Sequence, residues 1–206
     1  MWTHASAEAQ AATLSDDIAY DAHDIDDGLR ADLFTLEDIS EVPLVGNILN
    51  EIDAKHPRIE PARRVHETVR VLITRMIEDV IGETGRRAAM LNPRSVAEVR
   101  DAPRPLVAFS PAMEKADREI KAFLYPRMYR HDRVIRVMAD AEGVVRGLFA
   151  HYTQTPADLP EDWSEGIDTS DASSHSRRIA EYIAGMTDRY ALIEHSKYFK
   201  ATPELR

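Results

Sequence analysis

Apolar residues recur at spacings of three and four along residues 59–90, and this periodicity constrains the fold more than any other feature of the sequence. Such spacing places them along one side of a long helix. The stripe consists of Val65, Val69, Leu72, Met76, Val80 and Ile81. Only 8 glycines occur in 206 residues, and no run alternates β-branched with polar residues as a strand would. The sequence therefore predicts an all-α protein, a multi-helix bundle.

Capping residues and prolines predict where the other helices begin. Short helical segments are expected after Thr35 and Ser95, and longer ones are expected at residues 7–33, from Leu44, 111–125, 132–152 and 174–199. The first helix has the stripe Ile18, Ala22, Ile25 and Leu29, and the last has Ile179, Ile183, Met186, Tyr190 and Ile193. "PLVAFS" (105–110) is the only strand-like piece, and residues 155–174 are typical of a polar loop.

Several classes of protein are excluded by composition. The chain has no cysteine, so it can form neither disulfides nor thiolate metal sites. No apolar run approaches the roughly 18 residues of a transmembrane helix, and the first ten residues lack the pattern of a signal peptide. A protein of the reducing cytoplasm, without a membrane partner, is therefore expected.

The negative charge is concentrated near the N-terminus. The formal net charge is −10, and residues 1–60 alone carry 14 acidic and 3 basic side chains. Specific binding to nucleic acid is not expected, because it requires a basic face. A cation or a basic partner near the first helix remains compatible with this distribution.

The stretch "LSDDIAYDAHDIDDGL" (14–29) contains six of these acidic residues, all aspartates. A calcium loop is excluded because His23 and Ile25 occupy positions that need oxygen ligands. A solvated acidic face is one interpretation. The other starts from Asp16, Tyr20 and Asp24, which are four residues apart and so share one helix face. Two carboxylates and a phenol could there meet a metal, a phosphate or a sugar, although one aspartate alone is a weak metal ligand.

A family resemblance favours the second interpretation. The run "EAQAATLSDDIAYDAHDIDDGLRADLF" resembles a signature of the deoxyguanosinetriphosphate triphosphohydrolase-like family, a branch of the HD-domain phosphohydrolases. Similar segments follow in order, namely "VPLVGNIL", "RMIEDVI", "RPLVAFS", "IKAFLYPRMYRHDRV", "AEGVVRGLF" and "EYIAGMTDRYALIEH". The resemblance covers essentially the whole chain and implies an HD-superfamily type of helical bundle.

The resemblance also implies roles for three residues. Asp16 matches the last metal-ligand aspartate of the family, Tyr20 a tyrosine that lines the nucleotide pocket, and Asp24 an aspartate that binds the sugar 3′-hydroxyl. The implied reaction is hydrolysis of a deoxynucleoside triphosphate such as dGTP to deoxynucleoside and triphosphate, with a divalent metal, Mn²⁺ or Mg²⁺.

The other metal ligands of the family, a histidine and a His-Asp doublet, lie far upstream of the matched aspartate. Only fifteen residues precede Asp16 here, and His4 is their one histidine. We therefore expect a C-terminal half that is inactive alone, with residues 1–34 ending the HD core and 35–206 forming the C-terminal helical region. The alternative is a non-catalytic helical module that binds nucleotides or sister subunits. Either a homo-oligomer or a separate N-terminal half is an expected partner.

Two groups of basic residues are candidate phosphate contacts, since guanidinium groups bind phosphate oxygens in bidentate fashion. One group near the start of the long helix consists of Arg63, Arg64, His66 and Arg70, and the other consists of Lys121, Arg127 and Arg130. The alternative for the second group is a solvated basic stripe that pairs with acids elsewhere.

Overall fold

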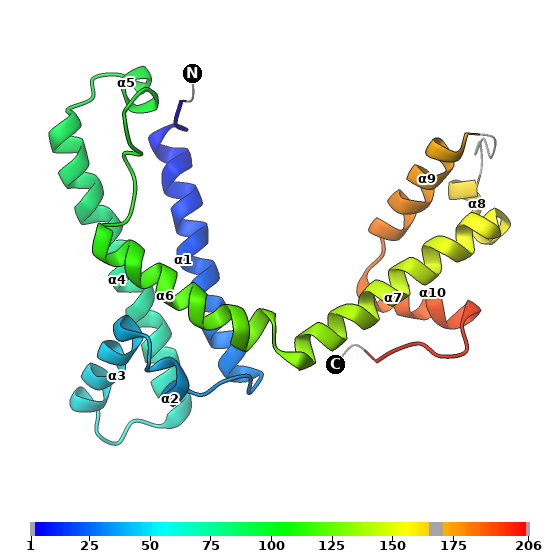
Figure 1. Cartoon of the computed structure of the whole chain (residues 1–206), viewed down its shortest axis with the longest axis horizontal. Helices are drawn as coiled ribbons and strands as arrows, with labels where there is room; N and C mark the ends of the chain where they lie inside the picture. Colours follow the sequence, from blue (N-terminus) through cyan, green and yellow to red (C-terminus); the bar gives the residue numbers. More distant parts are fainter. Residues whose placement is uncertain (1–2, 165–170, 205–206) are drawn as a thin grey trace. The chain divides into compact units, whose positions relative to one another are not determined.

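A computed structural model describes residues 3–164 and 171–204 (Figure 1). Ten α-helices, one π-helical turn and one 3-10 turn account for the regular structure of these residues, and they contain no β-strand. The all-α prediction is thereby confirmed. None of the helices among the described residues combines the length and the apolar content that crossing a bilayer requires.

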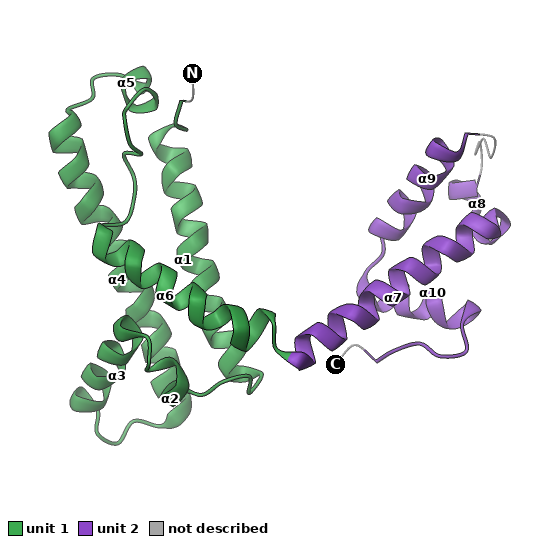
Figure 2. Ribbon diagram, in the orientation of Figure 1, with its two compact units in different colours: residues 1–131 green, residues 132–206 purple. Residues whose placement is uncertain are grey.

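The chain divides into two compact units, residues 1–131 (unit 1) and 132–206 (unit 2), which Figure 2 shows in different colours. Each unit has its own cluster of buried apolar side chains. The sequence analysis divided the chain by function, into the end of the HD core (residues 1–34) and the C-terminal helical region (35–206). The two compact units do not test that division, which stays a prediction.

Unit 1 contains six α-helices and the π-helical turn. They are α1 (Ala7–Arg30), α2 (Leu36–Ile39), α3 (Pro43–Lys55), α4 (Pro61–Leu91), α5 (Val96–Arg100), α6 (Pro111–Leu124) and η1 (Tyr125–Tyr129). The capping predictions are confirmed, because the side chains of Thr35, Ser95 and Ser110 each accept a hydrogen bond from the first turn of α2, α5 and α6. Thr35 and Asp38 form a complete capping box.

The core of unit 1 forms where α1, α3, α4 and α6 bury their apolar stripes together. Fully buried members include Ala22, Ile25, Val45, Ile48, Leu72, Met76, Ile120 and Leu124. The predicted stripe of the long helix is correct at Leu72 and Met76 but wrong at Ile81, which is 66% exposed. Ile81 directly follows Val80, so a helix turn of about 100° per residue carries it away from the core.

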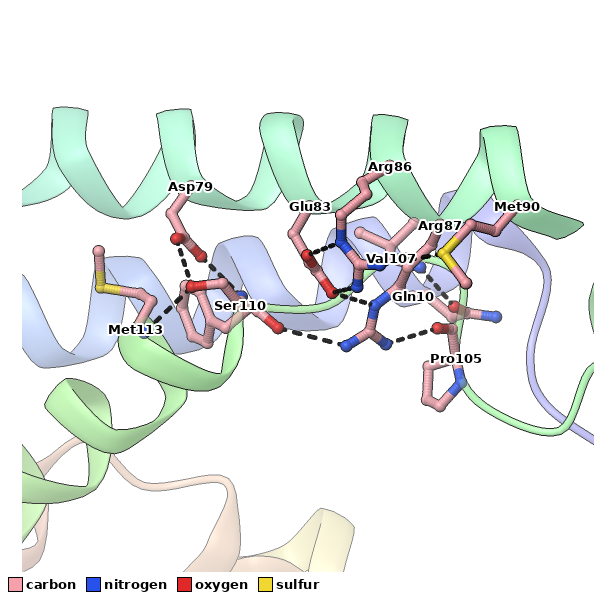
Figure 3. Close-up of polar contacts among 11 residues, drawn as sticks. Gln10, Asp79, Glu83, Arg86, Arg87, Met90, Pro105, Val107, Ser110 and Met113 are labelled. Atoms are coloured by element: carbon pink, nitrogen blue, oxygen red, sulfur yellow. Dashed lines mark hydrogen bonds and ion pairs between the residues drawn. The ribbon is translucent and has the colours of Figure 1, made fainter.

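The predicted strand-like segment 105–110 is an irregular connector, and side chains bond several of its polar groups (Figure 3). Asp79 of α4 accepts hydrogen bonds from the Ser110 N–H at 2.8 Å and its hydroxyl at 2.6 Å. Arg87 donates to the carbonyl of Pro105 at 2.8 Å, and Gln10 of α1 accepts from the Val107 N–H at 3.0 Å. Side chains of α1 and α4 thus satisfy part of the backbone that a neighbouring strand would otherwise pair.

Unit 2 contains α7 (Asp132–Gln154), η2 (Pro156–Asp158), α8 (Glu161–Ser164), α9 (Ala172–Ala184) and α10 (Asp188–Tyr198). The prediction of one last helix over residues 174–199 is wrong. Helix α9 ends at Ala184 with Gly185 as its C-cap, and Thr187 caps the start of α10 by accepting a hydrogen bond from the Tyr190 N–H. The predicted polar loop contains η2 and α8, and its residues 165–170 lie outside the described part.

The break also divides the predicted stripe of the last helix. Ile179 and Ile183 of α9 are buried against Leu148 and Tyr152 of α7 in the core of unit 2. Tyr190 and Ile193 of α10 are 41% and 49% exposed, because the new helix direction turns them out of that core.

Candidate functional site

Asp16, Tyr20 and Asp24 lie on one face of α1, as their spacing predicts, because α1 is a continuous α-helix from Ala7 to Arg30. Asp16 is exposed, Tyr20 is 59% exposed, and Asp24 is buried at 9%. The face therefore changes over two turns from an open carboxylate, through an accessible aromatic ring, to a sheltered carboxylate. This gradient of exposure suits a ligand that has one end in solvent and the other end enclosed by the protein.

The buried end of this face has a partner that the sequence analysis missed. The phenol of Tyr129, in η1, donates a hydrogen bond to Oδ2 of Asp24 across 105 residues of chain. Burial, followed by this contact with Asp24, raises the pKa of Tyr129 above its ordinary value, and the nearby Tyr20 raises it further. Tyr129 therefore remains a protonated donor at neutral pH. The aromatic run "YPRMY" was a visible signal, but no local pattern links it to α1.

Another aspartate of α1, Asp21, faces α6 and has different neighbours. The carboxyl of Asp21 is 1% exposed and lies beside that of Asp117, while Nζ of Lys121 is 2.9 Å from Asp117 and 3.9 Å from Asp21. Burial, followed by the contact with the Asp117 carboxyl, raises the pKa of Asp21 to about 8. Two carboxyls this close favour one shared proton. Part of the charge in the aspartate-rich stretch is thus neutralised inside the protein.

Most of the predicted phosphate contacts already have partners within the chain. Lys121 also approaches Asp17 at 4.0 Å, in addition to the two acids above. Arg64 joins α4 to Asp53 of α3 at 2.7 Å and to Glu37 of α2 at 3.1 Å. A phosphate would have to replace these carboxylates to bind here.

Two further arginines of the predicted phosphate contacts also have partners within the chain. Arg70 pairs with Glu67 one turn earlier at 2.7 Å. Arg127 lies 3.3 Å from Glu41 and stacks over the Phe123 ring. The alternative of a basic stripe that pairs with acids therefore describes Arg127 well.

Arg130, Arg63 and His66 are less constrained. The guanidinium of Arg130 donates to the hydroxyl of Tyr125 at 3.1 Å and keeps further donors. Arg63 is exposed beside a shallow hollow with Glu67. His66 is exposed and lines a small cavity between α1 and α4 with Asp26. These three residues remain the more accessible candidates for an anion.

The described residues fit a metal ion only in part. No described residue pairs with the carboxylate of Asp16, so that both of its oxygens are available. Within residues 3–164 and 171–204, however, no three histidine or acidic side chains converge as a metal centre requires. Asp16 can therefore supply one ligand of a metal site, and further ligands would have to come from outside these residues.

Comparison with known proteins reveals similarity along the whole chain. Residues 107–197 match the phosphohydrolase-associated domain family. Three relatives, each called a deoxyguanosinetriphosphate triphosphohydrolase-like protein, come from Azorhizobium caulinodans, Bradyrhizobium sp. (strain ORS 278) and Parvibaculum lavamentivorans. The first two are 52% identical over the full chain, and the third is 47% identical over 96% of it. The match covers 51%, 53% and 50% of these relatives, so the chain spans about half of their length.

Proposed function

Because the chain belongs to the deoxyguanosinetriphosphate triphosphohydrolase-like family, we propose that its helix α1 supplies part of the active site of a metal-dependent deoxynucleoside triphosphate hydrolase. Residues 1–34 would end the HD core, and residues 35–206 would form the C-terminal helical region, which contains the match to the phosphohydrolase-associated domain. We place the proposed activity in the cytoplasm, the compartment that a chain without cysteine favours.

One observation carries the proposal: Asp16, Tyr20 and Asp24 project from the same face of α1 with graded exposure. Asp16 would hold a divalent metal, either Mn²⁺ or Mg²⁺. The other ligands would correspond to the half of the relatives that this chain does not match. A metal bound there would supply the Lewis acidity that activates water for attack on the α-phosphorus. The water oxygen would bond to that phosphorus, the bond to the sugar 5′-oxygen would break, and that oxygen would take up a proton, which would release deoxynucleoside and intact triphosphate.

The other two residues of the face would bind the nucleoside part. The exposed ring of Tyr20 offers a flat apolar surface for the sugar, and its hydroxyl can donate to a phosphate oxygen. The carboxylate of Asp24 would accept a hydrogen bond from the 3′-hydroxyl. Among the basic residues, Arg63, His66 and Arg130 have the accessible donors that a triphosphate would meet.

The test measures triphosphate release from dGTP with Mn²⁺. Residues 1–206 alone are compared with a chimera that joins them to the half of the Azorhizobium caulinodans relative that they do not match. We expect activity from the chimera, none from residues 1–206 alone, and loss of activity on Asp16→Ala. Glu114→Ala, which removes an exposed carboxylate of α6, is the matched control. Full activity in the Asp16→Ala chimera would contradict the assignment.

A second candidate function, subunit assembly without catalysis, is favoured by an exposed apolar row on α7. Ile135, Met138 and Val145 are 43%, 64% and 48% exposed and lie within the matched phosphohydrolase-associated region. Exposed apolar rows of this kind mark protein interfaces. Sedimentation of the wild-type chain and of Met138→Glu tests this assembly. We expect an oligomer for the wild type and a smaller species for the variant, and a monomer in both samples would count against assembly.

A further inference from the structure

The turn that follows α6 is an unusual element, and it determines where Tyr129 points. Residues 125–129 form a π-helix, in which the Arg130 N–H donates to the Tyr125 carbonyl five residues earlier at 3.0 Å. Pro126 has no N–H and so cannot make the ordinary bond to the residue four positions before it. Single π-turns of this kind are rare in proteins as a whole, but where they occur they are often at functional sites.

The wider turn changes the direction of the side chains after it. One extra residue in a turn rotates the following residues by roughly 100° relative to an uninterrupted α-helix. Leu124 ends α6 inside the core, and Tyr129 reaches α1 from the end of η1. The π-turn that contains Pro126 thus brings the Tyr129 phenol to the Asp24 carboxylate, which lies 105 residues earlier in the chain.

The contact occupies one side of Asp24 and leaves the other for a ligand. Tyr129 donates to Oδ2, so that Oδ1 lies outside this hydrogen bond. A carboxylate with two oxygens can accept from two directions, so Oδ1 can still receive a hydroxyl. Asp24 is 9% exposed, so its carboxylate is largely sheltered from water, whereas the ring of Tyr129 is 36% exposed; the hydrogen bond can hold the sheltered carboxylate in one orientation.

We propose that Tyr129 is a positioning residue, which holds the Asp24 carboxylate so that its free oxygen accepts a sugar hydroxyl of the nucleotide. This inference rests on the proposed function. It assigns to the C-terminal end of α6 a role in substrate selectivity, because a site built to accept a hydroxyl discriminates against a substrate that lacks it. Tyr129 itself need not touch the reacting phosphorus.

The first measurement tests the contact in residues 1–206 alone. Urea unfolding is compared for the wild type, Tyr129→Phe, Asp24→Ala and the double variant, which together form a double-mutant cycle. We expect the shift of the unfolding midpoint in the double variant to differ clearly from the sum of the two single shifts. Additive shifts would show that the two side chains do not interact and would overturn the inference.

The second measurement tests selectivity in the chimera. The kcat/KM for dGTP is divided by that for 2′,3′-dideoxy-GTP, which lacks the 3′-hydroxyl. We expect Tyr129→Phe to reduce this ratio by about tenfold, mainly through the KM for dGTP, since a hydrogen bond to a charged group is lost. Tyr190→Phe, which removes a hydroxyl from an exposed tyrosine of unit 2, is the matched control and should keep the ratio.

The outcomes separate this inference from the proposed function. An unchanged ratio in an active Tyr129→Phe chimera, or a reduced kcat with an unchanged ratio, would overturn the positioning role and leave the hydrolase proposal intact. An inactive wild-type chimera would overturn the proposed function and with it the role of Asp24 toward a sugar. The unfolding cycle would still decide whether Tyr129 holds Asp24.

Discussion

Two groups of aspartates lie on the same helix, α1, and the rest of unit 1 surrounds them differently. Asp21 is enclosed against Asp117 and Lys121 of α6, where a shared proton and an ammonium offset the charge. Asp16 is exposed, and no described residue pairs with it. The comparison shows that an acidic segment can serve packing on one face and remain available for a ligand on another.

The largest difference between the two groups is expected when one aspartate of each is replaced by asparagine and triphosphate release is measured. In the chimera, Asp16→Asn should reduce triphosphate release by about 100-fold or more, because an amide replaces the anionic ligand that a divalent metal prefers. Asp21→Asn should retain most of the activity, because Asp21 faces α6 rather than the ligand face. Equal losses in the two variants would remove the distinction between the groups.

The enclosed group should also make stability depend on pH. The pKa of Asp21 is about 8 in the folded protein and about 4 in an unfolded chain, so folding takes up a proton between these values. Stability should therefore fall as pH rises from about 4 to about 8, by up to about 5 kcal/mol, and change little from this source above pH 8.

Asp21→Asn should remove this component, since the amide does not titrate. Urea unfolding at intervals from pH 4 to pH 9 would measure it, and the variant should gain most over the wild type at the alkaline end. A wild type and variant with parallel pH profiles would contradict the raised pKa.

A smaller effect on stability is expected when Lys121, the cation beside Asp21 and Asp117, is replaced. Lys121→Met should lower the free energy of unfolding by about 1 kcal/mol, a modest value because the ammonium is partly exposed to water. The loss should disappear in an Asp117→Asn background, where the main ion-pair partner is already neutral. Unchanged stability together with a higher KM for dGTP in the chimera would instead place Lys121 at the triphosphate.

The sequence predicted those parts of the fold that depend on neighbouring residues. Thr35, Ser95 and Ser110 mark helix starts because the side chain of each accepts from the N–H three residues ahead. The break at residues 185–187 was missed, although Gly185 and Thr187 are common at helix ends and starts, because the apolar periodicity continues through it. Spacing by itself did not distinguish a continuous helix from two.

The common face of Asp16, Tyr20 and Asp24 was determined by the sequence alone, since an α-helix of 3.6 residues per turn leaves no other arrangement. Only the tertiary structure decided which carboxylates are enclosed and which are open. The partners of Asp21 and Asp24 are Asp117, Lys121 and Tyr129, which lie on α6 and η1 far along the chain. Contacts over such separations follow from how whole helices pack and from the π-turn at Pro126, and no local periodicity encodes them.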